Sequence, residues 1–405
     1  MPQDKKDKNL NVPPLRFPGF TDEWETHRLS SYAKKITKKN KGNEISNVLC
    51  NSANLGIIPQ SEYFDRDIAN SENTDNYYII EPGDFVYNPR KSVTAPYGPV
   101  NLYIGTGLGI ISPLYLCFKV DNLSKEFLLH WFKGYSWHRY VYSHGDTGVR
   151  YDRVSIKDDV FLDMPISLPS ICEQNIISTL LTLIDERIAT QNKIIEDLKS
   201  VISSISNKLF DGKMHIGDSN DEWVYMTLGD ITTNFNRRNK VCQHLPMFSV
   251  TNISGFSPQN EVFEGKEIKD EDISIYKIIH KGEFAYNPAR INVGSIGRYE
   301  GDAPCMISSL YICFRPKDNI DSDWLQYLLK SNKMVYQYGL YGEGGVRIYL
   351  FYPNFSRIKV WVPLLRTQEK IASILNSFKD KLFLETSLLR RLQEQKRYLL
   401  TRMFI

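Results

Sequence analysis

The sequence has no apolar run of the roughly 18 residues that a membrane-spanning helix needs, so we expect no membrane segment. The first 14 residues are polar and lack the apolar segment of a signal peptide, which predicts a disordered tail at 1–14 and a cytoplasmic protein. Only six cysteines occur, and none form a C-x-x-C pair, which argues against zinc and thioredoxin-like sites.

Signatures of common enzyme classes are also missing. The sequence has no G-x-G-x-x-G after a strand, no G-x-x-x-x-G-K-[ST], no H-E-x-x-H and no G-x-S-x-G. The seven histidines do not cluster at metal-ligand spacing, so we predict no catalytic, cofactor or metal residues. The net charge is only +3, so any case for nucleic-acid binding must come from local basic clusters.

The sequence does contain an internal duplication. Internal repeats are considered first, because they indicate the overall architecture of a chain. Their recurrence in one order predicts two homologous globular units. The repeated blocks are 22–24 and 221–223, 56–64 and 255–263, 83–89 and 282–288, 111–118 and 307–314, and 145–150 and 342–347.

Each copy ends in a long stretch with a heptad pattern. From Ile177 to Leu209, apolar residues alternate at spacings of four and three, with one polar break at Gln191. The same register runs from Ile371 to Met403, and Glu385 stands at the position of Gln191. About five heptads of this kind indicate a coiled coil, in which each helix is about 50–60 Å long.

Connectivity limits how the two helices can pair. The first helix leaves unit one and the second begins at unit two, so they are antiparallel if they pack together. We therefore predict an α+β fold, with two homologous α/β domains held apart by an intramolecular antiparallel coiled coil with pseudo-two-fold symmetry. The alternative is that each helix pairs with another subunit. The predicted segments are a tail (1–14), domain 1 (15–168), spacer helix 1 (169–212), domain 2 (213–362) and spacer helix 2 (363–405).

Within the globular units, residue types predict the local structure. Residues 77–87 and 110–120 are β-branched and aromatic and predict strands. Residues 124–141 and 322–338 have the period of helices with aromatic inner faces. Cys117 and Cys313 lie in matching apolar strands and are expected to be core thiols.

Basic loops recur at corresponding places in the two copies. Lysine and arginine on loops can neutralise phosphates and contact guanine edges, so we predict that these residues bind DNA. For Arg150 and Arg347 the alternative is a structural role that ties each unit to its helix. The predicted DNA-binding residues are Lys38, Lys39, Arg90, Lys91, Arg150, Arg153, Arg237, Arg238, Arg290 and Arg347.

The Tyr-Asn-Pro turns at 87–89 and 286–288 share part of the Asn-Pro-Pro-aromatic motif of amino-methyltransferases. In that motif a second proline follows, but this sequence has Arg90 and Ala289 there. A DNA-modifying methyltransferase-type enzyme is therefore one alternative function, and a pure protein scaffold is the other.

The doubled layout resembles the specificity subunit of type I restriction-modification systems. The resemblance rests on the opening segment 15–20 with Trp24, the Tyr-Asn-Pro turns, Gly-Val-Arg at 148–150 and 345–347, and the helix starts at 168–174 and 362–369. It implies a non-catalytic, cytoplasmic subunit of a host-defence complex. Each domain is expected to recognise one half of a bipartite, asymmetric DNA site, and the helices to set the gap.

The resemblance also implies the partners. One copy of the chain is expected to bind double-stranded DNA, two methyltransferase (modification) subunits and restriction/translocase subunits. S-adenosylmethionine, ATP and Mg²⁺ are expected in those partner subunits and not in this chain. The expected docking surface is the charged outer face of the helices, formed by Glu186, Arg187, Lys193, Glu196, Arg390, Arg391, Glu394 and Arg397.

Overall fold

The computed structural model describes residues 11–63, 74–145, 152–214, 216, 222–252, 255–259, 273–345 and 348–405. The chain divides into two compact units. Unit 1 consists of residues 1–192 and 387–405, and unit 2 of residues 193–386. Two long helices, α5 (Ile171–Phe210) and α11 (Leu365–Arg402), each contribute to both units.

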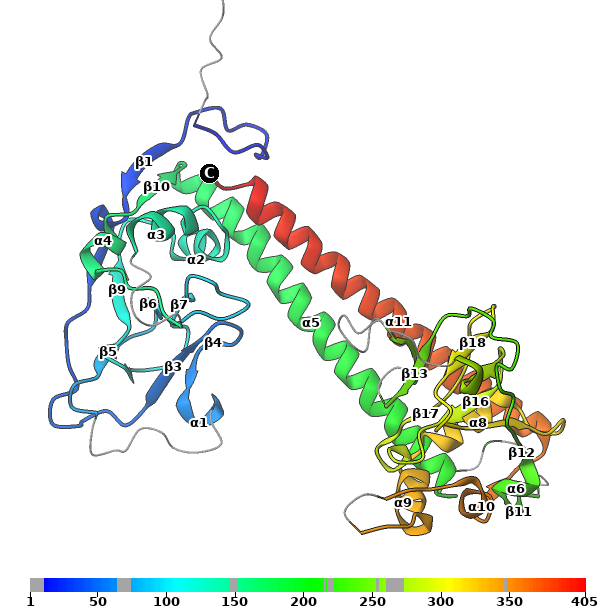
Figure 1. Ribbon diagram of the computed structural model, residues 1–405. Coiled ribbons are helices and arrows are strands. Elements are labelled where there is room, and N and C mark those ends of the chain that lie inside the picture. Colours follow the sequence, from blue (N-terminus) through cyan, green and yellow to red (C-terminus); the bar gives the residue numbers. More distant parts are fainter. Residues whose placement is uncertain are drawn as a thin grey trace, which may run out of the picture. The chain divides into compact units, whose positions relative to one another are not determined.

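Unit 1 combines short strands with short helices (Figure 1). Its strands are β1 (Glu25–Arg28), β2 (Ala33–Lys35), β3 (Val48–Ser52), β4 (Gly56–Pro59), β5 (Tyr78–Ile80), β6 (Asp84–Tyr87), β7 (Val100–Leu102), β8 (Gly109–Ile111), β9 (Leu116–Val120) and β10 (Pro165–Leu168). Its short helices are η1 (Leu29–Ser31), α1 (Gln60–Tyr63), α2 (Lys125–Lys133), α3 (His138–His144) and α4 (Asp158–Leu162).

Unit 2 repeats this composition. Its strands are β11 (Val224–Thr227), β12 (Thr232–Phe235), β13 (Phe248–Thr251), β14 (Gly255–Pro258), β15 (Lys277–Ile279), β16 (Phe284–Tyr286), β17 (Ile296–Arg298), β18 (Cys305–Ile307), β19 (Ile312–Pro316) and β20 (Lys359–Val362). Its short helices are α6 (Leu228–Ile231), η3 (Ile273–Ile275), η4 (Ile291–Val293), α8 (Ser322–Leu329), α9 (Asn332–Tyr341) and α10 (Tyr352–Phe355).

The sheet topology confirms the duplication. Unit 1 has a four-stranded sheet in the order β2-β9-β6-β7, and unit 2 has the matching order β12-β19-β16-β17. A second sheet, β4-β3-β8-β5, corresponds to the pairs β13-β14 and β15-β18. In each unit a two-stranded ribbon, β1-β10 or β11-β20, joins the beginning of the unit to the strand that leads into a long helix.

Alternation along the central strands places the sheet of each unit between two cores. In β6, Phe85 and Tyr87 join the core on the helix side, whereas Val86 joins a smaller core on the other face. In β16, Phe284 and Tyr286 point to one core and Ala285 to the other. Because successive strand side chains point to opposite faces, one apolar strand supplies both cores.

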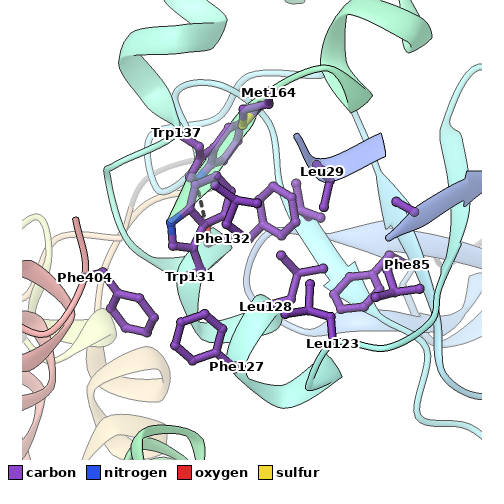
Figure 2. Close-up of a cluster of buried hydrophobic side chains, with 14 of the residues drawn as sticks. Leu29, Phe85, Leu123, Phe127, Leu128, Trp131, Phe132, Trp137, Met164 and Phe404 are labelled. Carbon is purple, nitrogen blue, oxygen red and sulfur yellow. Dashed lines mark hydrogen bonds between the residues drawn. The ribbon is translucent and has the colours of Figure 1, made fainter. Parts of the chain in front are cut away.

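The larger core of unit 1 is rich in aromatic rings. Figure 2 shows Trp131, Phe132 and Trp137 gathered together, and Phe127 near Phe404. The ring centroids of Phe127 and Phe404 lie 5.2 Å apart. The Nε1–H of Trp137 donates to the carbonyl of Phe132 at 3.0 Å, which satisfies its polar edge inside the core.

The two long helices pack against each other in opposite directions (Figure 1). In unit 1, Ile177 and Leu181 of α5 share a core with Leu399 and Met403 at the end of α11. In unit 2, the last turn of α5 shares a core with Ile371, near the start of α11. The predicted intramolecular antiparallel coiled coil is therefore confirmed, and every residue of the predicted heptad positions is buried or half-buried.

Other sequence predictions hold with corrections. The expected helices 124–141 and 322–338 are each two helices, so those predictions were wrong in extent. In unit 1 the chain leaves α2 at Gly134, which is extended, and in unit 2 the Ser331 hydroxyl caps the start of α9. The strands expected at 77–87 and 110–120 are likewise each two strands, β5–β6 and β8–β9. Cys117 and Cys313 are buried free thiols, as predicted.

Candidate DNA interface

The Asn-Pro turn of unit 1 is held by a small polar network. The buried Asn88 donates from Nδ2 to the carbonyl of Asn51 at 3.1 Å. Its Oδ1 accepts from the N–H of Arg90 at 3.0 Å, which fixes the direction of the chain after β6. Asn51 also accepts from Nδ2 of Asn101 at 2.7 Å. The network connects three strands beneath the loop and positions Arg90 at the surface.

Three of the predicted DNA-binding residues come together on this loop. Arg90 and Arg153 form an antiparallel β-bridge, and the N–H of Lys91 donates to the carbonyl of Asp152 at 2.8 Å. Nε of Arg90 and Nε of Arg153 lie 4.0 and 3.9 Å from a carboxylate oxygen of Asp152. The loop therefore presents Arg90, Lys91 and Arg153 as one basic cluster. Arg150 lies outside the described residues.

The matching turn of unit 2 is built in the same way. Oδ1 of Asn287 accepts from the N–H of Ala289 at 3.0 Å, and the exposed Arg290 follows at the start of η4. The N–H of Leu350 donates to the carbonyl of Pro288 at 3.0 Å, as Val154 does to Pro89 in unit 1. Arg347 lies outside the described residues.

A second pair of basic segments follows β2 and β12. Lys38 and Lys39 are exposed, and Lys39 pairs with Tyr78 in an isolated β-bridge. Nζ of Lys39 donates to Oδ1 of Asn76 at 3.2 Å. In unit 2, Arg238 is exposed and bridges to Lys277. These segments thus occupy the same position at the edge of the second sheet in both copies.

Arg237 is engaged in a different way. Its guanidinium makes two hydrogen bonds to the carboxylate of the buried Glu283, at 2.8 and 2.9 Å, and lies over the ring of Phe235. The hydrogen bond to Glu283 raises the pKa of Arg237. This pair ties the segment to the turn before β16, so Arg237 has a structural partner inside the protein.

The structure adds residues that the loops alone did not reveal. Leu114 and Leu310 occupy the same turn in the two copies and are 62% and 74% exposed. The residue after Leu114 is Tyr115. Burial raises the pKa of Tyr115, while the charges of Arg90 and Arg153 lower it, so the cations lie near this turn. The recurrence of block 111–118 as 307–314 was the sequence signal for this turn.

Within the part of the chain that the structure describes, no group of three or more histidine, cysteine or acidic residues is arranged to hold a metal ion. No helix among the described residues is long and apolar enough to cross a membrane.

Known proteins resemble the chain in both sequence and fold. Residues 220–394 match the family described as type I restriction modification DNA specificity domain. The HsdS subunit from Thermoanaerobacter tengcongensis is 15% identical, and the match covers 98% of this chain and 99% of that one, with a TM-score of 0.50. The type I restriction-modification S subunit from M. genitalium is 16% identical, with coverage of 97% and 99% and a TM-score of 0.55.

A third similar chain comes from a structure that describes complex assembly and conformational transition of the type I R-M system. It is 14% identical, with coverage of 97% and 99% and a TM-score of 0.58. No curated protein sequence matches the chain significantly.

These comparisons first give the fold class. The type I specificity subunits among the matches share this chain's fold, which has two α/β domains and a pair of antiparallel helices. In sequence, residues 220–394 are similar to the type I restriction modification DNA specificity domain, and in fold the whole chain is similar to type I specificity subunits. The prediction that the chain is a non-catalytic subunit agrees with the family whose model matches residues 220–394.

Proposed function

We propose that each globular unit recognises one half of a bipartite, asymmetric site in double-stranded DNA. The observation that carries this proposal is the recurrence of an exposed arginine after the same Asn-Pro turn in both units, Arg90 and Arg290. A cation held by a rigid turn on a strand end can neutralise a phosphate or donate to a guanine edge. The exposed Lys38, Lys39 and Arg238 and the half-buried Lys91 and Arg153 are proposed to contribute to DNA binding in their own units, and Arg150 and Arg347 remain predictions.

The sequences of the two units differ most clearly in the segment that follows the Asn-Pro turn, which is where recognition of different bases would require different side chains. The frameworks of β6 and β16 match, but the loop at 92–100 in unit 1 and the segment at 291–299 in unit 2 have unrelated sequences. In unit 2 this segment forms η4, whereas the loop in unit 1 has no helix. Direct recognition of bases depends on such side chains, so the two half-sites are expected to differ.

The helices are proposed as the spacer that sets the number of base pairs between the half-sites. By sequence length, α5 has 40 residues and α11 has 38, or about 57–60 Å at 1.5 Å per residue. One turn of B-DNA is about 34–36 Å. A packed helix pair is a stiff spacer, so it would fix one gap length.

The outer face of the helices is proposed as the dock for two methyltransferase subunits, which restriction/translocase subunits join. All eight charged residues predicted for this face are exposed, from Glu186 on α5 to Arg397 on α11. S-adenosylmethionine, ATP and Mg²⁺ would be bound by those partners. One copy of this chain per complex would act on DNA in the cytoplasm.

Methylation sequencing tests the proposal. The chain is expressed together with its methyltransferase subunit in cells that lack other DNA methylation, and the modified positions are mapped. We expect one bipartite motif with two unlike halves and a fixed gap. A symmetric motif, a continuous motif, or methylation by the chain without its partner would contradict the proposal.

Salt dependence separates this function from that of a pure protein scaffold. Neutralising phosphates releases counterions, so DNA affinity of the assembled complex should fall steeply and linearly on a logarithmic plot against salt. A DNA affinity that did not change between about 50 and 200 mM salt would favour the scaffold.

A further inference from the structure

Unit 2 contains a cavity that the proposed DNA interface does not use. Its volume is about 350 Å³, and it lies where the ends of β14 and β17 approach α8 and α11. Phe248 and Phe256 line it together with Tyr299, which follows β17. The centroid of the Tyr299 ring lies 5.4 Å from that of Phe248 and 5.3 Å from that of Phe256. Ligand pockets of about 300 Å³ and above accommodate small molecules, and aromatic walls favour a planar ligand group.

The floor of this cavity is bare backbone. Gly255 of β14 and Gly297 of β17 are close neighbours, since a Cβ added to Gly297 would lie 3.3 Å from the Cα of Gly255. A side chain at Gly297 would therefore press on the opposite strand and fill the space. The glycine leaves peptide groups within reach of a ligand.

Two lysines place positive charge at the cavity. Lys330 extends from the end of α8, and its Nζ would lie 3.8 Å from a Cβ on Gly255. Lys379 reaches the cavity from α11. Burial lowers the pKa of Lys330, and the like charge of Lys379 lowers it further. A bound anion between the two ammonium groups would relieve their repulsion.

The other charges of the cavity are already paired. Nε of Arg298 donates to the carboxylate of Glu300 at 2.8 Å, and its second nitrogen pairs with Asp323. The remaining polar atom is Oε1 of Gln326, which is buried and has no hydrogen-bond partner among the described residues. Such an acceptor is costly unless a donor reaches it, and a ligand amino or hydroxyl group would satisfy it.

Unit 1 keeps Tyr103 and Lys133 at the positions of Tyr299 and Lys330 but lacks the other features of the cavity. Leu49 and Ile57 stand where unit 2 has Phe248 and Phe256, and Asp185 stands where it has Lys379. The cavity between β7 and the end of α2 in unit 1 has a volume of only about 130 Å³. The two units are proposed to share the recognition of DNA, so a feature present in one of them belongs to a different task.

We propose that the unit 2 cavity binds a mononucleotide-sized aromatic anion. The base would lie against Phe248 and Phe256, the phosphate would sit between Lys330 and Lys379, and a donor group would meet Gln326. The ligand is either a free nucleotide or one unpaired nucleotide of a DNA strand. Duplex DNA fits poorly, because its bases are paired and stacked and do not offer their faces to a protein ring.

Calorimetric titration of the full-length chain tests this site. The probes are AMP, GMP, CMP and UMP, with inorganic phosphate and adenosine as partial ligands. We expect saturable binding of at least one mononucleotide at one site per chain, and at least tenfold weaker binding of phosphate and adenosine. Lys379→Asp and Phe256→Ile each install the residue of unit 1, and each should weaken binding at least fivefold. For Phe256→Ile the reason is that base–aromatic stacking alone contributes about that much to affinity.

Lys370→Asp is the matched control, because it makes the same charge change at an exposed position of α11 that does not line the cavity. It should leave nucleotide binding unchanged. Competition then separates the two sources of the ligand: displacement by a short single strand indicates an unpaired nucleotide, and no displacement indicates a free one.

Three results would overturn the proposal. They are no saturable binding of any of the four mononucleotides, equal loss in the Lys370→Asp control, and stoichiometric displacement by duplex DNA. The last result would assign the cavity to the duplex-binding surface. Thermal unfolding of each variant shows whether it is folded, and Gln326→Leu, which keeps size and removes the acceptor, offers an independent variant with the same expected loss.

Discussion

At the scale of single residues, the arginines after the Asn-Pro turns decide whether the proposed interface is correct. Arg290→Ala in the assembled complex should lower methylation by about 5- to 150-fold, since one good contact to a base or phosphate contributes about 1–3 kcal/mol. The loss should fall on the half-site of unit 2, and Arg90→Ala should act on the other half. Methylation sequencing of both variants measures this. Unchanged methylation in both would remove these arginines from the interface.

Arg237 should behave differently from its neighbour Arg238. Arg237→Ala removes two hydrogen bonds from the buried carboxylate of Glu283, which keeps only the one from the N–H of His280, so we expect a loss of about 1–3 kcal/mol in the free energy of unfolding. Arg238→Ala should leave stability nearly unchanged and reduce the salt slope of DNA binding by about one. Urea unfolding and salt titration of the two variants give both quantities. Equal effects on stability would be evidence against this division.

This contrast shows how far sequence alone could describe the proposed interface. The loops that carry Lys38, Arg90 and Arg290 were predictable, because basic residues recur beside the same framework blocks. The pairing of Arg237 with Glu283 was not, since 46 residues separate the two and only the packing of β12 near β16 brings them together.

A buried histidine in unit 1 makes a pH prediction. Burial lowers the pKa of His130 to about 4, and Nε2 lies 3.1 Å from Oγ1 of Thr182. The unfolded chain binds this proton near pH 6.5, whereas the folded chain stays neutral until about pH 4. Stability is therefore present in full above about pH 6.5 and falls as the pH drops toward 4, by about 2 kcal/mol at pH 5.

Urea unfolding between pH 7.5 and 5.0 measures this slope, and His130→Gln should remove most of it. The range avoids the titration of ordinary carboxylates. A wild-type stability that stays constant over it, or a variant with the same slope as the wild type, would show that His130 is not the group responsible.

At the scale of elements, the start of each long helix is tied to its globular unit by one glutamine. Oε1 of Gln174 accepts from the N–H of Ser124 at 3.1 Å, and Oε1 of Gln368 accepts from the N–H of Asp321 at 2.9 Å. Both side chains also donate to the carbonyl of the proline before the helix, at 2.9 Å. The offset of 194 residues brings these glutamines into correspondence, and it also predicted the helix pair.

The shorter elements were less predictable. Apolar period and residue type gave the strand and helix regions, but the breaks inside them depend on local backbone geometry. The chain turns at Gly134 after α2 because the extended glycine ends the helix there. In unit 2 a serine cap performs the corresponding change of direction. A glycine in one unit and a serine in the other thus produce the same break between two helices. A search of the sequence for one residue type would therefore miss one of the two breaks.

The helix seam makes a prediction at this scale. Ile188 of α5 is half-buried against the core of unit 1. Ile188→Asp would place an unpaired charge in that contact and should destabilise the chain by several kcal/mol. Arg187→Asp, on the exposed neighbouring position, is the control and should change stability little. Thermal unfolding of both variants tests the seam, and a Tm of Ile188→Asp equal to that of the control would contradict it.

At the scale of the whole molecule, the duplication and the antiparallel helices together relate symmetry to the DNA site. Proteins with two-fold symmetry recognise sequences with matching symmetry. In the natural chain the symmetry is only approximate, because the segments at 92–100 and 291–299 differ, and this is why an asymmetric site is proposed. Making the two domains identical should therefore make the recognised DNA sequence symmetric.

A chimera tests that relation. Residues 15–168 would replace residues 213–362, so that both ends of the helix pair carry the first domain. Expressed with the methyltransferase subunit, it should direct methylation to an inverted repeat of the first half-motif, with the gap within about one base pair of the original. The reciprocal chimera should give an inverted repeat of the other half-motif. A direct repeat would contradict the proposed relation between the duplication and the symmetry of the DNA site. A folded chimera whose complex still methylated the original asymmetric motif would show that the domains do not carry the specificity, because the only remaining difference between its two halves lies in the helices.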